Sequence, residues 1–106
     1  MRIVFDLDGT LCTNENGDYE RATPILQRIS RVNDLHDAGN TIIIFTARGM
    51  GRNGGDIAKS KFMFEMLTRE QLSKWGVKYD DLILGKPAGD LYIDDKGESD
   101  VNFFKD

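Results

Sequence analysis

The chain has 106 residues, of which 40% are hydrophobic and 30% are charged, and its formal net charge is −4 at pH 7. These values are typical of a soluble globular protein with one core, so we expect residues 1–106 to form a single domain. No apolar stretch approaches the roughly 20 residues of a membrane span. The one cysteine excludes an intramolecular disulfide and fits the reducing cytoplasm, and there is no basic stripe of the kind that binds nucleic acid.

The first predicted strand covers residues 2–7, and two aspartates lie at its end. Asp6 and Asp8 are two positions apart, so their side chains point to the same face at the end of this strand. Two like charges held this close need compensation, which a cation or a shared proton usually supplies. The first strand therefore indicates a metal-assisted site.

Residues 12–22 are polar, and an Asn-Gly pair near their centre is a strong signal for a hairpin turn. This predicts a small β-flap over the end of the first strand. Thr23 and Pro24 then match the N-cap and the first position of a helix. Because Gly39 is a typical helix stop, we expect the helix to end there.

Residues 41–46 form the second predicted strand, which is apolar on both faces as in parallel sheets. A loop over residues 47–56 follows, with four glycines and two arginines. Residues 57–75 predict a helical region that a capping-box pattern divides in two. Its candidate core residues are Phe62, Met63, Met66 and Leu67.

Two short apolar runs complete the predicted sheet. Residues 82–84 lead to Lys86, and residues 91–93 lead to Asp94 and Asp95. The last residues predict a short helix that packs on the sheet. Strands that alternate with helices imply an α/β fold with a parallel sheet of about four strands, joined by right-handed crossovers.

Polar side chains stand at the carboxyl end of every predicted strand, and these ends meet at the edge where open α/β sheets bind ligands. Carboxylates suit Mg²⁺, while Lys86 and the Thr46 hydroxyl suit phosphate oxygens. An aspartate can attack phosphorus, and a second carboxylate two residues away can move the proton. The sequence therefore predicts a site that handles a phosphoryl group on a metal.

Four motifs in order resemble those of haloacid dehalogenase (HAD) superfamily phosphatases. They are residues 6–10, the strand that ends at Thr46, the lysine at position 86, and residues 91–95. The resemblance covers nearly the whole chain. It implies a Rossmann-like fold flanked by helices, Mg²⁺ as cofactor, and phosphomonoester hydrolysis through an aspartyl-phosphate.

The resemblance also implies a role for each matching residue. Asp6 would be the nucleophile, Asp8 the general acid/base, and Thr46 and Lys86 the phosphate-binding pair. The implied metal ligands are Asp6, Asp8 through its backbone carbonyl, Asp94, and Asp95, which would act through water or hold Lys86 instead. The expected substrate-binding residues are Gly9, Thr10, Ala47 and Arg48.

Finer features, such as Thr46-Ala47-Arg48 and the sequence around Tyr92, resemble small phosphatases of capsule and surface-polysaccharide biosynthesis. A sugar phosphate is the substrate that this implies. Larger relatives carry a cap domain after the first or second motif, whereas those intervals hold here only the flap and short helical regions. We therefore expect an open, capless site and a homo-oligomer that supplies a lid, with no membrane or nucleic-acid partner.

Two other functions stay open. An open site also fits a phosphatase of nucleotides or polynucleotide 3′ ends, although the chain lacks a basic groove. An inactive regulatory or interaction module would keep the same fold, but the intact aspartates and Lys86 argue against it. The sequence does not decide whether Arg52 and Tyr19 contact substrate or pack.

Overall fold

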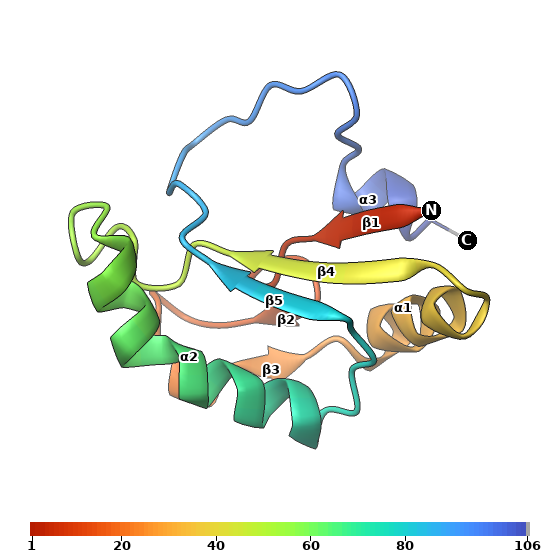
Figure 1. Ribbon diagram of the computed structural model, residues 1–106, viewed down its shortest axis with the longest axis horizontal. Coiled ribbons are helices and arrows are strands. Elements are labelled where there is room, and N and C mark those ends of the chain that lie inside the picture. Colours follow the sequence, from red (N-terminus) through yellow and green to blue (C-terminus); the bar gives the residue numbers. More distant parts are fainter. Residues whose placement is uncertain (106) are drawn as a thin grey trace.

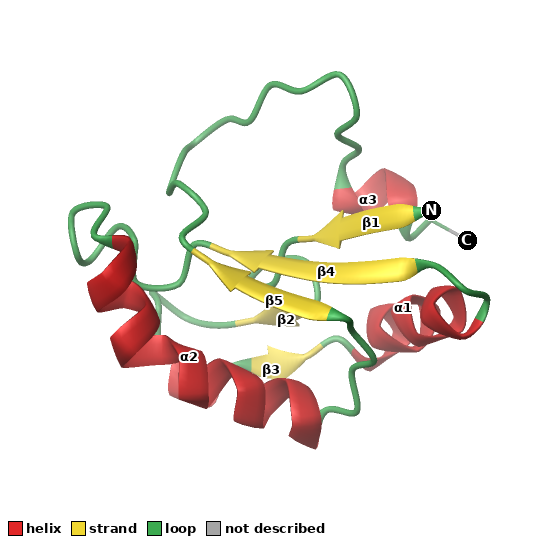
Figure 2. Ribbon diagram, viewed as in Figure 1, coloured by secondary structure: helices red, strands yellow, loops and turns green. Residues whose placement is uncertain are grey.

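The structure, a computed structural model, describes residues 1–105 and is built around a parallel sheet (Figure 1, Figure 2). In spatial order, its strands are β1 (Arg2–Phe5), β4 (Thr41–Thr46) and β5 (Asp81–Leu84). Both neighbouring pairs are parallel, with Phe5 opposite Ile44 and Thr46 opposite Leu84. The predicted α/β class with a parallel sheet is confirmed, with three described strands instead of about four.

Helices and a second, two-stranded sheet surround these strands. They are α1 (Leu26–Asp37), α2 (Ile57–Lys74), α3 (Asp100–Phe103), the 3₁₀ turn η1 (Tyr19–Arg21), and the antiparallel pair β2 (Cys12–Thr13) and β3 (Thr23–Pro24). In Figure 1, α1 and α2 lie along the same side of the sheet. Within residues 1–105, no helix combines the length and the apolar character that a membrane crossing requires.

The hydrophobic core lies on the face of the sheet that α1 and α2 cover. Ile42 and Ile44 of β4 are fully buried there, together with Val32 of α1 and Leu72 of α2. Side chains alternate between the two faces of a strand, and Val4 on the opposite face of β1 is 56% exposed. Each fully buried aliphatic side chain stabilises the fold by about 1.5–3 kcal/mol, so this one face supplies most of the cohesion that holds the strand ends in place.

The predicted flap between β1 and α1 is present, but it is longer than a tight hairpin. β2 pairs with β3, and η1 lies between them. Asn16 and Gly17 have φ angles of 52° and 77°, the left-handed conformation that an Asn-Gly turn requires. The prediction that Thr23 caps the helix was wrong, because Thr23–Pro24 pairs with β2 and α1 begins at Leu26.

α2 is one continuous helix, so the predicted division by a capping box was wrong. Thr68 and Gln71 are buried helical residues instead. Two of the predicted core residues, Phe62 and Met66, are 91% and 75% exposed, whereas Phe64 is buried. The helix therefore turns a partly polar face toward the rest of the protein.

The predicted strand at residues 91–93 is not a strand in the described structure. After β5 the chain leaves the sheet as a long loop that reaches α3 (Figure 2). Leu91 and Ile93 are largely exposed in this loop. The Tyr92 hydroxyl donates to the carbonyl of Pro87 and accepts the N–H of Gly89, so these polar groups are paired within the loop and not across a sheet.

The predicted C-terminal helix packs on the sheet, as expected. The rings of Phe103 and Phe104 lie with their centroids 5.6 and 6.0 Å from that of Phe5. Arg28 of α1 lies 4.9 Å from the centroid of Phe104 and pairs with Asp100 at 2.7 Å. These contacts join α3 to both β1 and α1.

Candidate active site

Four of the predicted site residues lie at the carboxyl ends of the three parallel strands. Asp6 and Asp8 follow β1, Thr46 ends β4, and Lys86 follows β5. All four line one pocket of about 450 Å³. Because β1, β4 and β5 point in the same direction (Figure 1), the topology of the sheet brings these side chains together.

The loop after β1 is wound around one carbonyl oxygen. The Leu7 oxygen accepts N–H bonds from Thr10, Leu11 and Cys12 at 3.1, 2.8 and 3.3 Å. Gly9 has a φ of +85°, and an added Cβ there would meet no atom within 4 Å. Glycine is therefore favoured here because of its left-handed backbone conformation, and not because another group packs closely against it. Leu7 and Leu11 are fully buried. The loop that carries both aspartates is therefore anchored in the core.

Asp6 contacts one ammonium group and one hydroxyl. Lys86 Nζ lies 3.4 Å from Oδ1, and Thr10 Oγ1 donates to Oδ2 over 3.2 Å. The Lys86 ammonium also lies 4.5 Å from the ring centroid of Tyr92, and the Lys86 backbone N–H donates to the Thr46 carbonyl over 3.2 Å. The lysine is therefore held beside the end of β4 with its charge next to Asp6.

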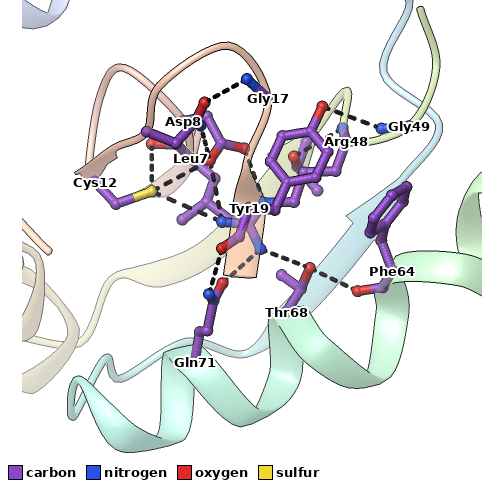
Figure 3. A network of polar contacts seen from close by, with 12 residues as sticks. Leu7, Asp8, Cys12, Gly17, Tyr19, Arg48, Gly49, Phe64, Thr68 and Gln71 are labelled. Carbon is purple, nitrogen blue, oxygen red and sulfur yellow. Dashed lines mark hydrogen bonds and ion pairs between the residues drawn. The ribbon is translucent and has the colours of Figure 1, made fainter. Parts of the chain in front are cut away.

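The Asp8 carboxylate accepts bonds from four donors (Figure 3). Arg48 Nε donates to Oδ2 over 2.8 Å and Nη2 donates to Oδ1 over 3.0 Å, the two-point geometry of a guanidinium on a carboxylate. Oδ1 also accepts from Asn14 Nδ2 at 2.9 Å and from the Cys12 thiol, whose Sγ lies 3.4 Å away. Three donors thus converge on Oδ1, and one reaches Oδ2.

The rest of the Arg48 guanidinium is bound to α2 and to Cys12. Nη1 donates to Thr68 Oγ1 over 3.1 Å and to Gln71 Oε1 over 2.6 Å, and Nη2 also reaches Cys12 Sγ at 3.8 Å. All five N–H groups of the guanidinium therefore have an acceptor, and the side chain is 0% exposed. Arg48 also lines the pocket, and the predicted contact with a substrate anion stays a prediction that would require Arg48 to exchange one of these bonds.

Tyr19 of the flap packs against this network. The Arg48 and Arg52 guanidinium carbons lie 5.0 and 5.8 Å from its ring centroid. Gln71 Nε2 donates to the Tyr19 carbonyl over 2.6 Å, and the Gly49 N–H donates to the Tyr19 hydroxyl over 3.3 Å. The flap is therefore joined both to α2 and to the loop after β4, and Tyr19 packs in this network and also lines the pocket.

The other predicted substrate-binding residues divide into two groups. Ala47 lines the pocket beside Thr46. The Thr46 hydroxyl oxygen accepts the Arg48 backbone N–H over 3.1 Å, so its own proton points elsewhere. Gly9 and Thr10 shape the loop after β1 and are not among the residues that line this pocket.

Cys12 lies at the base of the flap, next to Asp8. Burial raises the pKa of the Cys12 thiol to about 12, and the neighbouring Asp8 carboxylate acts in the same direction. At neutral pH the sulfur is therefore a protonated thiol that donates to Asp8. A thiol in this state is a poor nucleophile, so Cys12 supports the site as a donor and a packing group.

Asp94 and Asp95, two of the predicted metal ligands, are not among the residues that line the pocket. They belong to the exposed loop between β5 and α3. The Lys96 N–H donates to Asp94 Oδ1 over 3.0 Å, and this bond holds the pKa of Asp94 below its ordinary value. Within residues 1–105, no cluster of three or more His, Cys, Asp and Glu side chains is arranged to hold a metal ion.

Asp6 is the predicted metal ligand whose surroundings suit Mg²⁺. Its carboxylate lines the pocket and is about one-third exposed. In enzymes Mg²⁺ often takes one or two carboxylates, several waters and the phosphate of the substrate, with no complete protein cage. The predicted ligand atom of Asp8 is its backbone carbonyl oxygen, which stays a prediction, and the Asp8 carboxylate is bound at both oxygens by Arg48. In this structure the two Asp6 oxygens are partnered by Lys86 and Thr10, so a cation at Asp6 would share this carboxylate with them.

Sequence reasoning missed three residues that hold Asp8 and Arg48. Asn14 belongs to the flap and to no motif, while the sequence pattern suggests a capping box for Thr68 and Gln71. The spacing of Thr68 and Gln71 from Phe64 and Leu72 places these residues on one face of α2, and this spacing was a usable signal. Polar residues within an otherwise buried helix face indicate a buried polar partner, which here is the arginine after β4.

Comparison with known proteins gives three structural relatives. No family model and no curated protein matches the chain. The crystal structure of a target protein from Vibrio cholerae is 33% identical, with a TM-score of 0.90 over 98% of this chain and 87% of that chain. The chain also resembles a component of the Pnkp1/Rnl/Hen1 complex, with 20% identity, a TM-score of 0.59, and coverage of 89% of this chain and 30% of that chain.

A third relative is D,D-heptose 1.7-bisphosphate phosphatase from B. bronchiseptica, which was crystallised with magnesium and phosphate. It is 17% identical, with a TM-score of 0.55 over 84% of this chain and 51% of that chain. At this level of identity the second and third relatives show a shared fold. This chain accounts for about half or less of their length.

Proposed function

Because this chain belongs to the same family as the Vibrio cholerae protein and has a HAD-like fold, we propose that it is a phosphomonoester hydrolase of the HAD type. One observation carries the proposal: Asp6, Asp8, Thr46 and Lys86 line a single pocket at the carboxyl edge of the sheet. An inactive module that kept only the fold would have no need for this set of charges.

In the proposed reaction, Asp6 attacks phosphorus and forms an aspartyl-phosphate while the bond to the leaving oxygen breaks. Lys86 and the Thr46 hydroxyl hold the phosphate oxygens. Asp8 gives a proton to the leaving oxygen, and it later takes a proton from the water that attacks the aspartyl-phosphate. The second step releases phosphate and restores Asp6. The observed ammonium next to Asp6 supports this division of roles, because it would lie beside the negatively charged oxygens of a phosphoryl group that Asp6 attacks.

We propose that the reaction requires Mg²⁺, with Asp6 as the protein ligand in the pocket. When bound, the cation would offset the repulsion between the Asp6 carboxylate and the substrate phosphate. Support comes from the exposed carboxylate of Asp6 and from the magnesium and phosphate in the B. bronchiseptica phosphatase. Asp94 and Asp95 stay predicted ligands that would have to approach from the loop after β5.

A sugar phosphate is the proposed substrate. The B. bronchiseptica relative acts on a heptose bisphosphate by its name. Around the charged end of the pocket stand Asn14, Arg52 and Tyr92, and such polar and aromatic groups suit a polyhydroxylated ring. We further propose that the enzyme works in the cytoplasm on precursors of a surface polysaccharide, and that a second copy of the chain closes the open pocket.

A phosphatase of polynucleotide 3′ ends is the second candidate. The observation that favours it is the fold shared with the Pnkp1/Rnl/Hen1 complex. The net charge of −4 counts against it, because nucleic-acid binding relies on positive charge. Release of phosphate from a 3′-phosphorylated oligonucleotide, without activity on sugar phosphates, would reverse this order.

The test is phosphate release from hexose and heptose phosphates, with Mg²⁺ and with EDTA. We expect the wild type to turn over at least one sugar phosphate and to lose activity in EDTA. Asp6→Asn should lower the rate by at least about a thousandfold. The control is Asp34→Asn, which makes the same chemical change at an exposed position of α1. Equal rates for Asp6→Asn and Asp34→Asn would overturn the proposal.

A further inference from the structure

We infer that Arg48 is a positioning residue for Asp8: its guanidinium, fixed by α2, orients the Asp8 carboxylate and reserves Oδ2 for the proton that Asp8 transfers. This inference rests on the proposed function, in which Asp8 is the general acid/base. It adds a function for the buried arginine that follows β4 and for the two polar residues of α2 that bind it.

The backbone of Asp8 and its side chain are fixed by separate sets of bonds. The loop wound around the Leu7 oxygen sets the backbone. The side-chain torsions are set by Arg48, which binds both oxygens at 2.8 and 3.0 Å (Figure 3), whereas Asn14 and Cys12 bind Oδ1 alone. A two-point contact fixes the plane of the carboxylate as well as its distance, which a single ammonium does not achieve.

The two oxygens of Asp8 are not equivalent in this network. Oδ1 accepts from Arg48 Nη2, from Asn14 Nδ2 and from the Cys12 thiol, whereas among residues 1–105 Oδ2 accepts only from Arg48 Nε. A carboxylate oxygen has about two lone-pair positions. Oδ1 is therefore fully used, and Oδ2 keeps an acceptor position where a proton can bind.

Arg48 is itself fixed by α2. Thr68 Oγ1 accepts from Nη1 and donates in turn to the Phe64 carbonyl over 2.7 Å. Gln71 accepts from the same nitrogen and donates to the Tyr19 carbonyl. A buried ion pair often adds no stability relative to apolar residues of similar volume. The ordered bonds on both sides of the guanidinium are therefore better explained by orientation than by stability.

The proton balance involves Asp8 and leaves Arg48 unchanged. In the first step, the proton on Asp8 Oδ2 moves to the leaving oxygen as the phosphorus–oxygen bond of the substrate breaks. In the second step, the attacking water returns a proton to Oδ2 as the bond between phosphorus and Asp6 breaks. Arg48 exchanges no proton in either step, so it acts only through the direction in which Oδ2 points.

Two substrates with different leaving groups can distinguish a positioning role of Arg48 from a purely structural one. A sugar alkoxide needs the proton from Asp8, whereas p-nitrophenolate is a weak base and departs without one. General acid catalysis contributes about 10²- to 10⁴-fold to such reactions. The quantity to measure is kcat/KM, because it reports the step in which the leaving group departs. It is compared between the best sugar phosphate and p-nitrophenyl phosphate.

For Arg48→Lys we expect kcat/KM to fall about tenfold to a hundredfold with the sugar phosphate, and less than about threefold with p-nitrophenyl phosphate. Because Arg48 is buried, a second variant leaves it in place: Thr68→Val removes one acceptor from Nη1 and should give the same pattern at a smaller size. Arg69→Lys is the control, since Arg69 is an exposed residue of α2 that pairs with Glu65. Circular dichroism checks the fold of each variant.

A double-mutant cycle then tests whether Arg48 acts through Asp8. In an Asp8→Asn background, Arg48→Lys should change kcat/KM for the sugar phosphate by less than about twofold. Equal losses with both substrates, or no loss with the sugar phosphate, would overturn the positioning role and leave the proposed phosphatase intact. A wild type that releases phosphate from neither substrate would instead overturn the proposed function itself.

Discussion

Lys86 offers a direct test of the phosphate end of the pocket. Its ammonium lies 3.4 Å from Asp6 Oδ1, and its side chain is 20% exposed. The Lys86 backbone bond to the Thr46 carbonyl fixes where the side chain starts. We predict that Lys86→Met, which removes the charge but keeps much of the side-chain volume, weakens the binding of inorganic phosphate.

The size of the effect follows from the charge-assisted hydrogen bond that the Lys86 ammonium would make to a phosphate oxygen. Charge-assisted hydrogen bonds contribute about 1.5–3 kcal/mol in practice. Since about 1.4 kcal/mol corresponds to a factor of ten, phosphate should bind about tenfold to a hundredfold more weakly.

The assay is competitive inhibition by inorganic phosphate, supported by calorimetry of phosphate binding to the same variants. Lys86→Arg keeps the charge and should lose less affinity than Lys86→Met. Lys78→Met is the matched control, because Lys78 pairs with Asp37 at an exposed site outside the pocket. Equal phosphate affinity in Lys86→Met and Lys78→Met would refute the assignment of Lys86 to the phosphate.

Three further predictions concern stability and reactivity. Phe64→Ala should lower the free energy of unfolding by about 3–5 kcal/mol, whereas Phe62→Ala should change it by less than about 0.5 kcal/mol, because Phe64 is buried and Phe62 is exposed; urea unfolding measures both. The hydrogen bond from Arg28 holds the pKa of Asp100 below its ordinary value of 3.8. Asp100→Asn should therefore destabilise the protein at pH 7, and this difference should shrink as pH falls below about 3.8, because the unfolded chain binds a proton there before the folded protein does; a constant difference down to the lowest pH would contradict the pairing. Native Cys12 should react with iodoacetamide at pH 8 far more slowly than in urea, because burial keeps it a thiol, and equal rates would contradict its burial.

The sheet edge could be predicted because its signals are local. Each strand of the sheet is a short apolar run with polar residues directly after it, and parallel strands bring such ends together whatever the details of packing. Asp6, Asp8, Thr46 and Lys86 therefore meet in the structure as the sequence predicts. Their chemical roles are not observable in the fold and stay proposals.

The face that α2 turns inward could not be predicted from hydrophobicity. Phe62 and Met66 are four residues apart and match an apolar core stripe, yet they are exposed. The buried face instead includes Thr68 and Gln71, because the guanidinium of Arg48 lies against it and needs oxygen acceptors. Polar helix residues are usually exposed, but here they are buried because they bind a buried polar partner.

The prediction of a strand at residues 91–93 was wrong for a different reason. Three apolar residues are too few to specify a strand without a partner, since pairing and burial decide such short runs. In the structure the Tyr92 hydroxyl finds its partners within the loop, at Pro87 and Gly89. The position of Asp94 and Asp95 depends on this segment, so their predicted metal role could not be judged from sequence spacing alone.

The central claim is that Asp6 accepts the phosphoryl group, and the most direct measurement is acid quenching of the protein during turnover of a sugar phosphate, followed by mass spectrometry of its peptides. The account predicts a phosphoryl group on Asp6 of the wild type, labile to hydroxylamine, together with loss of turnover in Asp6→Asn. Turnover that persists in Asp6→Asn, with no phosphoryl group on the wild-type peptide that contains Asp6, would contradict it.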